Sequence, residues 1–332
     1  MRRPHALFIL HPCFFDAVYG PQDREELRKL THFPEHCYSQ AEIAARPEVL
    51  ADVEFIYSSW GAPCLDEAFL NATPNLKAFF YAAGSIKGFV TEAFWERNIP
   101  ITSAVKMNAI PVAEFALGEI ILSQKWVWKY NQQIRELRDF PPDRQPPGLY
   151  GRTVAIISLG TIGCLVAEKL RHFDVRVIAY DPFASAEEAS KLGVKLVSLE
   201  EAFATADVVS LHTPLLEETT GMIDGKLLSS MKKGAVFINT ARGGLVKEPE
   251  MIEALSRRGD LFALIDHTTD EPPAKDSRLY TLPNVRLTPH IAGSTGSEIR
   301  RMGHCMVEEV RRFLNGEPLQ WQITREKEKI LA

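Results

Sequence analysis

Paired cysteines and cysteine–histidine clusters are missing from this sequence of 332 residues. Its five cysteines stand singly, their number is odd, and no two of them form a C-x-x-C pair. A disulfide-stapled scaffold is therefore excluded, and a reduced, cytoplasmic protein is expected. The nearest approach to a metal motif, His32 with His36 and Cys37, falls in a polar stretch that contains proline. We expect a surface loop there and no metal site.

Long hydrophobic runs and an excess of basic residues are also missing. The apolar residues 6–10 are followed at once by His11 and Pro12, so we expect a first buried strand rather than a secretory signal. The apolar stretch of residues 115–122 carries Glu119, which argues against a membrane span. The net charge of −5 argues against a protein that binds nucleic acid by neutralising phosphates.

Short runs rich in β-branched residues alternate with helical patterns, which predicts parallel sheets with crossover helices. The length indicates two domains. One long helix is expected over residues 107–138, and a closing helix over 297–314. The expected strands are residues 5–10, 53–58 and 77–82 in a first series, and 153–158, 175–180, 207–212, 235–239, 262–266 and 285–288 in a second. The six strands of the second series predict a dinucleotide-binding sheet.

A glycine-containing turn stands at the head of the second series. Gly160 has no side chain to keep a pyrophosphate away, and Gly163 allows the following helix to pack close to the sheet. Ser158 stands at the position of the first glycine of the usual fingerprint. Asp181 ends the next strand, where a carboxylate accepts hydrogen bonds from an adenosine ribose. The predicted cofactor is NAD, and NADP is disfavoured because Asp181 would repel a 2′-phosphate.

Three further segments place an arginine, a glutamate and a histidine at the carboxyl ends of expected strands, the edge where open α/β sheets bind ligands. They are NTARGGLV with Arg242, DHTTDEP with Glu271, and LTPHIAG with His290. A guanidinium holds a carboxylate and polarises a carbonyl, an imidazole transfers a proton, and a carboxylate orients the imidazole. Each residue alone has a structural alternative, such as a loop acid or a satisfied histidine. Their joint placement predicts a catalytic trio.

Through these motifs, with residues 149–163, HTPL at 212–215 and LPNV at 282–285, the chain resembles the D-isomer-specific 2-hydroxyacid dehydrogenases over nearly its whole length. The resemblance implies that Arg242 binds substrate, that His290 is the acid/base and that Glu271 is its partner. It implies an α/β fold of two doubly wound parallel-sheet domains. A Rossmann NAD-binding domain, residues 105–292, is inserted in a flavodoxin-like substrate domain, residues 1–104 and 293–332. A homodimer built largely on the long helix is also implied.

The turn and the resemblance together predict the residues that line the cofactor groove. His212 has strand-end packing as its structural alternative. The predicted set is Ser158, Gly160, Thr161, Ile162, Gly163, Asp181, His212, Thr213, Pro214, Thr240, Ala241, Arg242, Asp266, His290 and Gly293.

The substrate loop departs from the family pattern. By resemblance the substrate carboxylate is bound by backbone amides of a glycine loop, here Ala83, Gly84 and Ser85, with Trp60 nearby. This loop lacks the aspartate common after the glycine, and His267 stands where a small apolar residue is common. The structural alternative for Trp60 is packing in the hydrophobic core. These departures leave the substrate open.

The leading interpretation is an NAD-dependent oxidoreductase that interconverts a 2-oxo acid and a D-2-hydroxy acid. One alternative is a reductase of another acceptor, such as an amino-acid imine, on the same hydride donor. Another alternative is a cofactor-sensing regulatory protein. The intact trio favours the enzyme.

Overall fold

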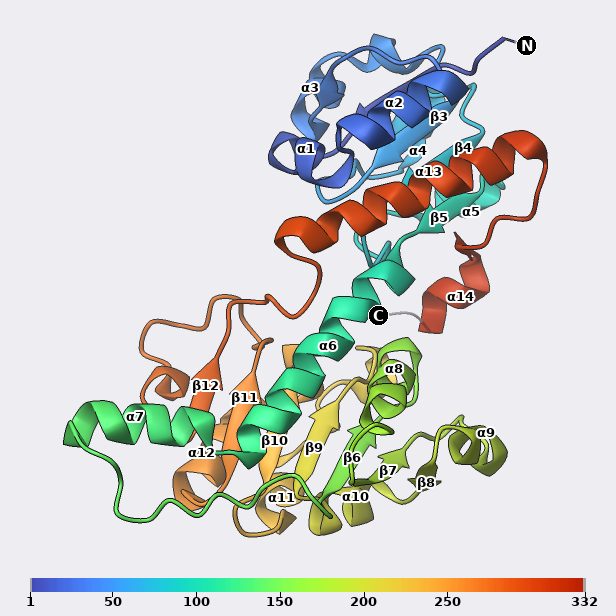
Figure 1. The fold of residues 1–332 in the computed structure, drawn as a ribbon. Coiled ribbons are helices and arrows are strands. Elements are labelled where there is room, and N and C mark those ends of the chain that lie inside the picture. Colours follow the sequence, from blue (N-terminus) through green and yellow to red (C-terminus); the bar gives the residue numbers. More distant parts are fainter. Residues whose placement is uncertain (1, 331–332) are drawn as a thin grey trace. The chain divides into compact units, whose positions relative to one another are not determined.

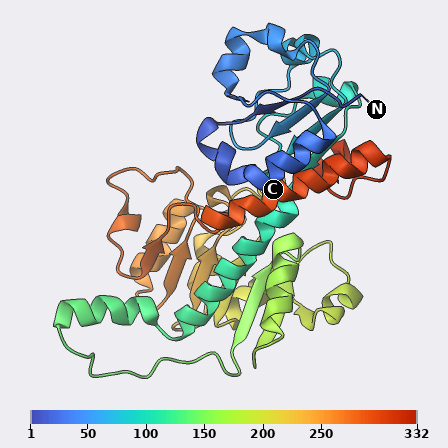
Figure 2. The ribbon, with the colours of Figure 1, turned by 45° about the horizontal axis from the view of Figure 1, so that its top comes forward.

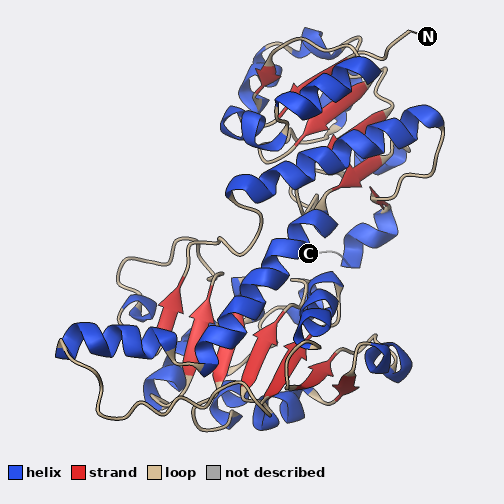
Figure 3. Cartoon of the chain, in the orientation of Figure 1, coloured by secondary structure: helices blue, strands red, loops and turns tan. Residues whose placement is uncertain are grey.

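The computed structural model describes residues 2–330 and divides the chain into two compact units. The first unit comprises residues up to Ala109 together with those from Ser294 onward. The second unit is Ile110–Gly293. Each unit is built around its own sheet, drawn as red arrows in Figure 3. No helix within residues 2–330 combines the length and the apolar character that crossing a membrane requires.

The first unit contains a six-stranded sheet in the order β13-β5-β4-β3-β1-β2. Its strands are β1 (Ala6–Ile9), β2 (Cys37–Tyr38), β3 (Phe55–Ser58), β4 (Ala78–Tyr81), β5 (Ile101–Ser103) and β13 (Gln322–Ile323). β1 to β5 are parallel, whereas β13 pairs antiparallel with β5. The order 2-1-3-4-5 of the parallel strands is the flavodoxin-like order. β1, β3 and β4 are buried throughout because helices cover both faces.

The helices of the first unit pack on both faces of this sheet, as Figure 1 shows. One face is covered by α1 (Phe15–Val18), α2 (Pro21–Leu30) and α13 (Ile299–Asn315), and the other by α3 (Gln40–Ala45), α4 (Glu67–Ala72) and α5 (Glu92–Glu96). α13 lies beside α1 and α2 (Figure 2). Its stripe of Met302, Met306 and Val310 is fully buried against the sheet, as the periodicity predicts. A short helix, α14 (Arg325–Ile330), follows β13.

The second unit contains a seven-stranded parallel sheet in the order β12-β11-β10-β9-β6-β7-β8. Its strands are β6 (Thr153–Ile157), β7 (Arg176–Tyr180), β8 (Val194–Leu196), β9 (Val208–Leu211), β10 (Val236–Asn239), β11 (Phe262–Ile265) and β12 (Val285–Leu287). Counted within the unit, this is the Rossmann order 3-2-1-4-5-6 with one more strand at the edge. α6 (Val105–Gln124), α8 (Thr161–Leu170) and α9 (Ala186–Lys191) cover one face, and α10 (Leu199–Thr205), α11 (Gly225–Ser230) and α12 (Glu248–Arg257) the other.

The expectation of a single long helix over residues 107–138 is wrong. The segment is two helices, α6 and α7 (Val127–Leu137), separated at Trp126, whose φ of 51° is left-handed. The amide of Trp126 donates to the carbonyl of Ser123, which tightens the last turn and ends α6. The Trp128 indole N–H then donates to Glu119 Oε2 at 3.0 Å and ties the start of α7 to α6.

Several short strands also differ from the sequence expectation. The surface loop expected around His32, His36 and Cys37 contains β2, in which Cys37 is buried opposite Phe8. The second sheet has seven strands rather than six, because β8 extends its edge. β2, β5, β8 and β13 have only two or three residues each, too few for an alternating or apolar run to appear in the sequence.

Candidate active site and cofactor site

The glycine turn of the second unit connects β6 to the N-terminus of α8. A Cβ on Gly163 would lie 2.0 Å from the Ser158 carbonyl oxygen, so only glycine allows α8 to approach the strand this closely. A Cβ on Gly160 would meet no heavy atom within 4 Å. Ser158, in place of the first glycine, takes the left-handed conformation with φ 79°. The turn therefore leaves open backbone at the N-terminus of α8, the usual place for a pyrophosphate.

Asp181 follows β7 and holds the turn from the side. Its Oδ2 accepts from the amide of Leu159 at 2.7 Å and from the hydroxyl of Ser158 at 3.3 Å. Its Oδ1 accepts from the amides of Phe183 and Ala184 at 2.8 and 3.0 Å. Four donors thus fix the carboxylate beside the turn.

Two buried polar atoms at the neighbouring strand ends lack any partner in the protein. The ring of His212, after β9, bonds Ser210 through Nε2 at 2.9 Å, while its Nδ1 has no hydrogen-bond partner. Burial lowers the pKa of His212 to about 4, so the ring is neutral at pH 7. Thr240 Oγ1, after β10, is likewise buried without a partner. Buried polar atoms are normally satisfied, so these two favour a ligand at this edge.

The other residues predicted for the groove lie along the same edge of the second sheet. Thr161 and Ile162 begin α8, Thr213 and Pro214 follow His212, Ala241 precedes Arg242, and Gly293 is the last residue of the unit.

Two contacts bring the Arg242 and Glu271 loops together. The side chain of Asn239, at the end of β10, donates to the carbonyls of Arg242 at 3.1 Å and His267 at 3.4 Å. A Cβ on Gly243 would lie 2.0 Å from the carbonyl carbon of Thr268, so the glycine next to Arg242 permits this close approach. The two loops therefore pack backbone against backbone.

The carboxylate of Asp266 attaches the loop that carries His290. Its Oδ1 accepts from the Thr288 hydroxyl at 2.5 Å and the Ile291 amide at 2.9 Å, and its Oδ2 from the Ala292 amide at 3.0 Å. His290 itself has a φ of 53°, a conformation uncommon for any residue but glycine. Sequence reasoning assigned Asp266 only to the cofactor and missed this structural role.

Glu271 lies between two histidines. Its Oε2 is 2.7 Å from Nδ1 of His290, and its Oε1 is 2.9 Å from Nδ1 of His267. Burial alone would raise the pKa of Glu271, but the hydrogen bonds and charges of the two histidines bring it below its ordinary value. Glu271 is therefore an anion at neutral pH. The bond to His290 matches the sequence prediction, whereas the contact with His267 was not predicted.

Arg242 is half-buried and keeps its charge. Its Nη1 donates to the carbonyl of Ala241 at 2.6 Å. Burial lowers the pKa of Arg242 and the charge of Glu271 opposes that shift, but a guanidinium stays protonated at any physiological pH. The second unit thus brings a cation, an anion and an exposed imidazole to one sheet edge.

The predicted substrate loop belongs to the first unit and follows β4. Ala83 is buried, while Gly84 and Ser85 are half-buried. The Ser103 hydroxyl donates toward the carbonyls of Ala83 at 2.9 Å and Gly84 at 2.6 Å, and so fixes the loop. The ring of Trp60 packs against that of Phe14, with centroids 4.9 Å apart and an angle of 55° between the planes.

Sequence reasoning missed Asn108, which lies beside this loop. Its Oδ1 accepts from the amide of Ser294 at 2.9 Å. Its Nδ2 would lie 3.6 Å from a Cβ on Gly84, so the amide nitrogen faces the loop. An asparagine three residues after the start of a helix gives no pattern in sequence, and only the fold brings it to Gly84.

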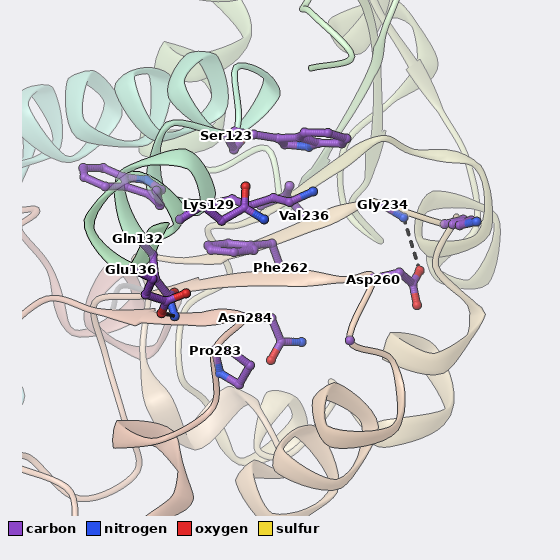
Figure 4. Close-up of a pocket in the computed structure, with 15 residues that line it drawn as sticks. Ser123, Lys129, Gln132, Glu136, Gly234, Val236, Asp260, Phe262, Pro283 and Asn284 are labelled. Atoms are coloured by element: carbon purple, nitrogen blue, oxygen red, sulfur yellow. Dashed lines mark hydrogen bonds between the residues drawn. The ribbon is translucent and has the colours of Figure 1, made fainter. Parts of the chain in front are cut away.

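A hollow of about 610 Å³ opens at the other end of the second sheet (Figure 4). It is lined by α7 residues such as Lys129 and Gln132, and by Val236 and Phe262 at the starts of β10 and β11. The candidate catalytic residues follow the carboxyl ends of the same strands. The hollow is therefore separate from the candidate active site.

The fold and the turn define a dinucleotide-binding α/β protein. Residues 118–292 match the model of the D-isomer specific 2-hydroxyacid dehydrogenase family, NAD binding domain. The chain belongs to this family, and the NAD cofactor predicted from the sequence is confirmed.

Known proteins of the family are similar over most of this chain. The D-3-phosphoglycerate dehydrogenase of Mycobacterium bovis is 34% identical over 275 residues, which are 83% of this chain and 51% of that protein. The chain thus spans about half the length of such curated relatives.

Solved structures share the fold of both units. A D-lactate dehydrogenase from Aquifex aeolicus, complexed with NAD and lactic acid, has a TM-score of 0.72 and 26% identity, covering 94% of this chain and 96% of that one. A phosphoglycerate oxidoreductase from Rhizobium etli has a TM-score of 0.82 and 22% identity, covering 98% and 99%. The predicted fold class is confirmed.

The two glycines of the turn should respond differently to alanine. Gly163→Ala should lower the free energy of unfolding by about 1–3 kcal/mol, because its Cβ would overlap the Ser158 carbonyl. Its thermal midpoint should fall accordingly. Gly160→Ala should leave the thermal midpoint unchanged and weaken NADH binding by roughly tenfold or more, because its methyl group would stand where the pyrophosphate approaches. Calorimetry and fluorescence titration with NADH measure both effects. Normal NADH affinity in Gly160→Ala would contradict this placement of the cofactor.

Proposed function

We propose that the protein is an NAD-dependent oxidoreductase that transfers a hydride between NAD(H) and a 2-oxo acid/D-2-hydroxy acid pair. The observation that carries the proposal is the imidazole of His290, bound through Nδ1 to the Glu271 carboxylate at 2.7 Å. This pair lies at the same sheet edge as the glycine turn and the unpartnered atoms of His212 and Thr240. The names of the relatives and the family match support the same reaction class.

The residues divide the chemistry among them. Bound NADH supplies the hydride. Arg242 holds the substrate carboxylate and polarises the neighbouring carbonyl. His290 binds Glu271 through Nδ1, so its Nε2 is the nitrogen that gives a proton to the carbonyl oxygen in reduction and takes it back in oxidation. Glu271 keeps the ring oriented and stabilises its cationic form.

The first unit is assigned to the substrate and the second to the cofactor, with boundaries near residues 104 and 293. The half-buried loop at Gly84 and Ser85 follows β4 and is fixed by Ser103, which suits backbone amides that bind a carboxylate. Ala83 and Trp60 flank this loop. Asn108, whose amide nitrogen faces Gly84, joins the proposed substrate residues.

NAD is preferred over NADP in this proposal because Asp181 presents a fixed carboxylate beside the turn. A 2′-phosphate would meet this negative charge. We assign the enzyme to the cytoplasm, since single, scattered cysteines suit a reducing compartment.

We further propose a homodimer that uses the α6–α7 region. Apolar side chains are exposed there on successive turns, with Ile134 40% and Leu137 54% accessible, and Phe140 follows. Exposed apolar side chains that cluster in this way mark interfaces. The hollow beside α7 adds further surface that a second copy could cover.

A panel of 2-oxo acids tests the reaction class. Loss of NADH absorbance is followed with pyruvate, hydroxypyruvate and phosphohydroxypyruvate, and the reverse reaction with D-lactate and D-3-phosphoglycerate. We expect turnover of at least one D acid and its oxo acid, with NADH favoured over NADPH. Reduction that requires added ammonia or an amine would indicate an imine reductase. NADH binding without turnover of any acceptor would indicate a regulatory protein.

The His290–Glu271 pair should show its role in the pH dependence of reduction. Glu271→Gln removes the anion that stabilises the imidazolium, so the reductive kcat/KM should begin to fall about one pH unit lower than in the parent. His290→Gln should abolish turnover while NADH titrations remain near normal. The alkaline limb is the pH range in which the reductive kcat/KM falls as the pH rises. If this limb lies at the same pH in Glu271→Gln as in the parent, the role given to Glu271 is wrong.

The proposed dimer can be measured directly. Light scattering should give twice the mass of the 37.3 kDa chain for the parent. The Leu137→Glu variant should shift the mass toward the monomer, because a charge in an apolar interface lacks a partner. Leu314→Glu, an exposed apolar position in α13 of the first unit, is the matched control and should stay dimeric. A monomeric parent would refute the interface.

A further inference from the structure

A second imidazole shares the Glu271 carboxylate. His267 follows Asp266 at the end of β11, and its Nδ1 lies 2.9 Å from Glu271 Oε1. The other carboxylate oxygen bonds His290. The side chain of His267 is only 4% exposed, whereas that of His290 is 53% exposed. The ring centroids of the two histidines are 3.8 Å apart at an angle of 62°. One histidine is therefore buried behind the other.

The hydrogen positions of this group follow from the chemistry of a carboxylate. An ionised carboxylate can only accept, so the Nδ1 atoms of both rings must carry protons. Burial, and then the charges of His290 and Arg242, lower the pKa of His267 to about 4. His267 is therefore neutral at pH 7, with its single N–H pointed at Glu271. Its Nε2 lies 3.8 Å from Asp266 Oδ2, beyond hydrogen-bond distance.

We propose that His267 is a positioning residue for the acid/base histidine. Its N–H fixes the far oxygen of Glu271, so that the near oxygen stays directed at Nδ1 of His290. The inference rests on the function proposed above, because it concerns the proton-transfer residue of that reaction. It adds a residue that lies outside the trio of Arg242, Glu271 and His290.

The neutral state of His267 matters for this role. A neutral donor orients the carboxylate without adding a second positive charge next to His290 and Arg242. The same donor stabilises the anionic form of Glu271 and so weakens its pull on the proton of His290. The other charged groups near this cluster are Asp266, which faces Nε2 of His267, and Glu119, which interacts with Asp266. Both remain in place when His267 is changed.

Leucine and asparagine form a matched pair at position 267. They have nearly the same shape, but only asparagine offers an N–H at the place of Nδ1. His267→Leu should lower the reductive kcat by roughly tenfold, because the carboxylate loses its fixed orientation. In the same variant the alkaline limb of the reductive kcat/KM should move up by about half a pH unit. The reason is that all of the charge of Glu271 then acts on His290. His267→Asn should restore both quantities most of the way toward the parent.

The direction of the shift separates positioning from packing. Glu271→Gln moves the alkaline limb down, whereas His267→Leu should move it up. A residue that only fills space would change the thermal midpoint and leave the limb in place. Equal pH profiles and equal kcat values in the Leu and Asn variants would overturn the inference while the parent still turns over. A parent that turns over no acceptor would instead refute the proposed function.

Nitrogen-15 NMR of the imidazoles gives a reading that does not depend on turnover. The His267 signals, assigned by their loss in His267→Asn, should be those of a neutral ring protonated at Nδ1 from pH 8 down to about pH 5. In Glu271→Gln the Nδ1 signal should change, because its acceptor is now a neutral amide. A His267 ring that titrates near pH 7, or that carries its proton on Nε2, would also overturn the inference.

Discussion

The buried carboxylate of Asp266 is the contact on which the candidate active site depends. Its side chain is 1% exposed, and leaving such a charge without partners would cost several kcal/mol. The donors that satisfy it are the hydroxyl of Thr288 and the amides of Ile291 and Ala292. The loop that carries His290 is therefore fixed to the end of β11 by the hydrogen bonds that the buried carboxylate requires. Asn239 does the same for the neighbouring loops through its amide, at lower electrostatic cost.

Because the seven strands of the second unit are parallel, the carboxyl ends of the strands all lie on one side of the sheet and the amino ends on the other. These two sides have different properties. Loops at the carboxyl ends carry Asp181, His212, Arg242 and His290 and bring polar groups that lack partners in the protein. At the amino ends, α7 lies beside a mostly apolar hollow. A protein that bound its cofactor and its second copy at the same edge would couple the two events. In the proposed dimer, the cofactor and the second copy would bind at opposite ends of the strands.

The sequence predicted the features that depend on residue type and order. Nine strands lie within a residue or two of their expected positions, and Glu271 bonds His290 as expected. The break at Trp126 was not predictable, because the apolar pattern continues across it and neither glycine nor proline marks it. Strands of two or three residues, such as β2, give no periodic signal. Asn108 was missed because its place beside Gly84 depends on tertiary structure.

His267 and His290 show why residue type alone could not define the site. They are the same amino acid on the same carboxylate, yet one is buried and neutral and the other is half-exposed. A sequence gives no direct reading of this difference, since it arises from the packing of the loops after β11 and β12. Burial removes His267 from proton exchange by penalising its charged form, and it leaves a single fixed donor. The exposed ring keeps a nitrogen that can meet a substrate. In the proposed mechanism, this difference in burial assigns orientation to His267 and proton transfer to His290.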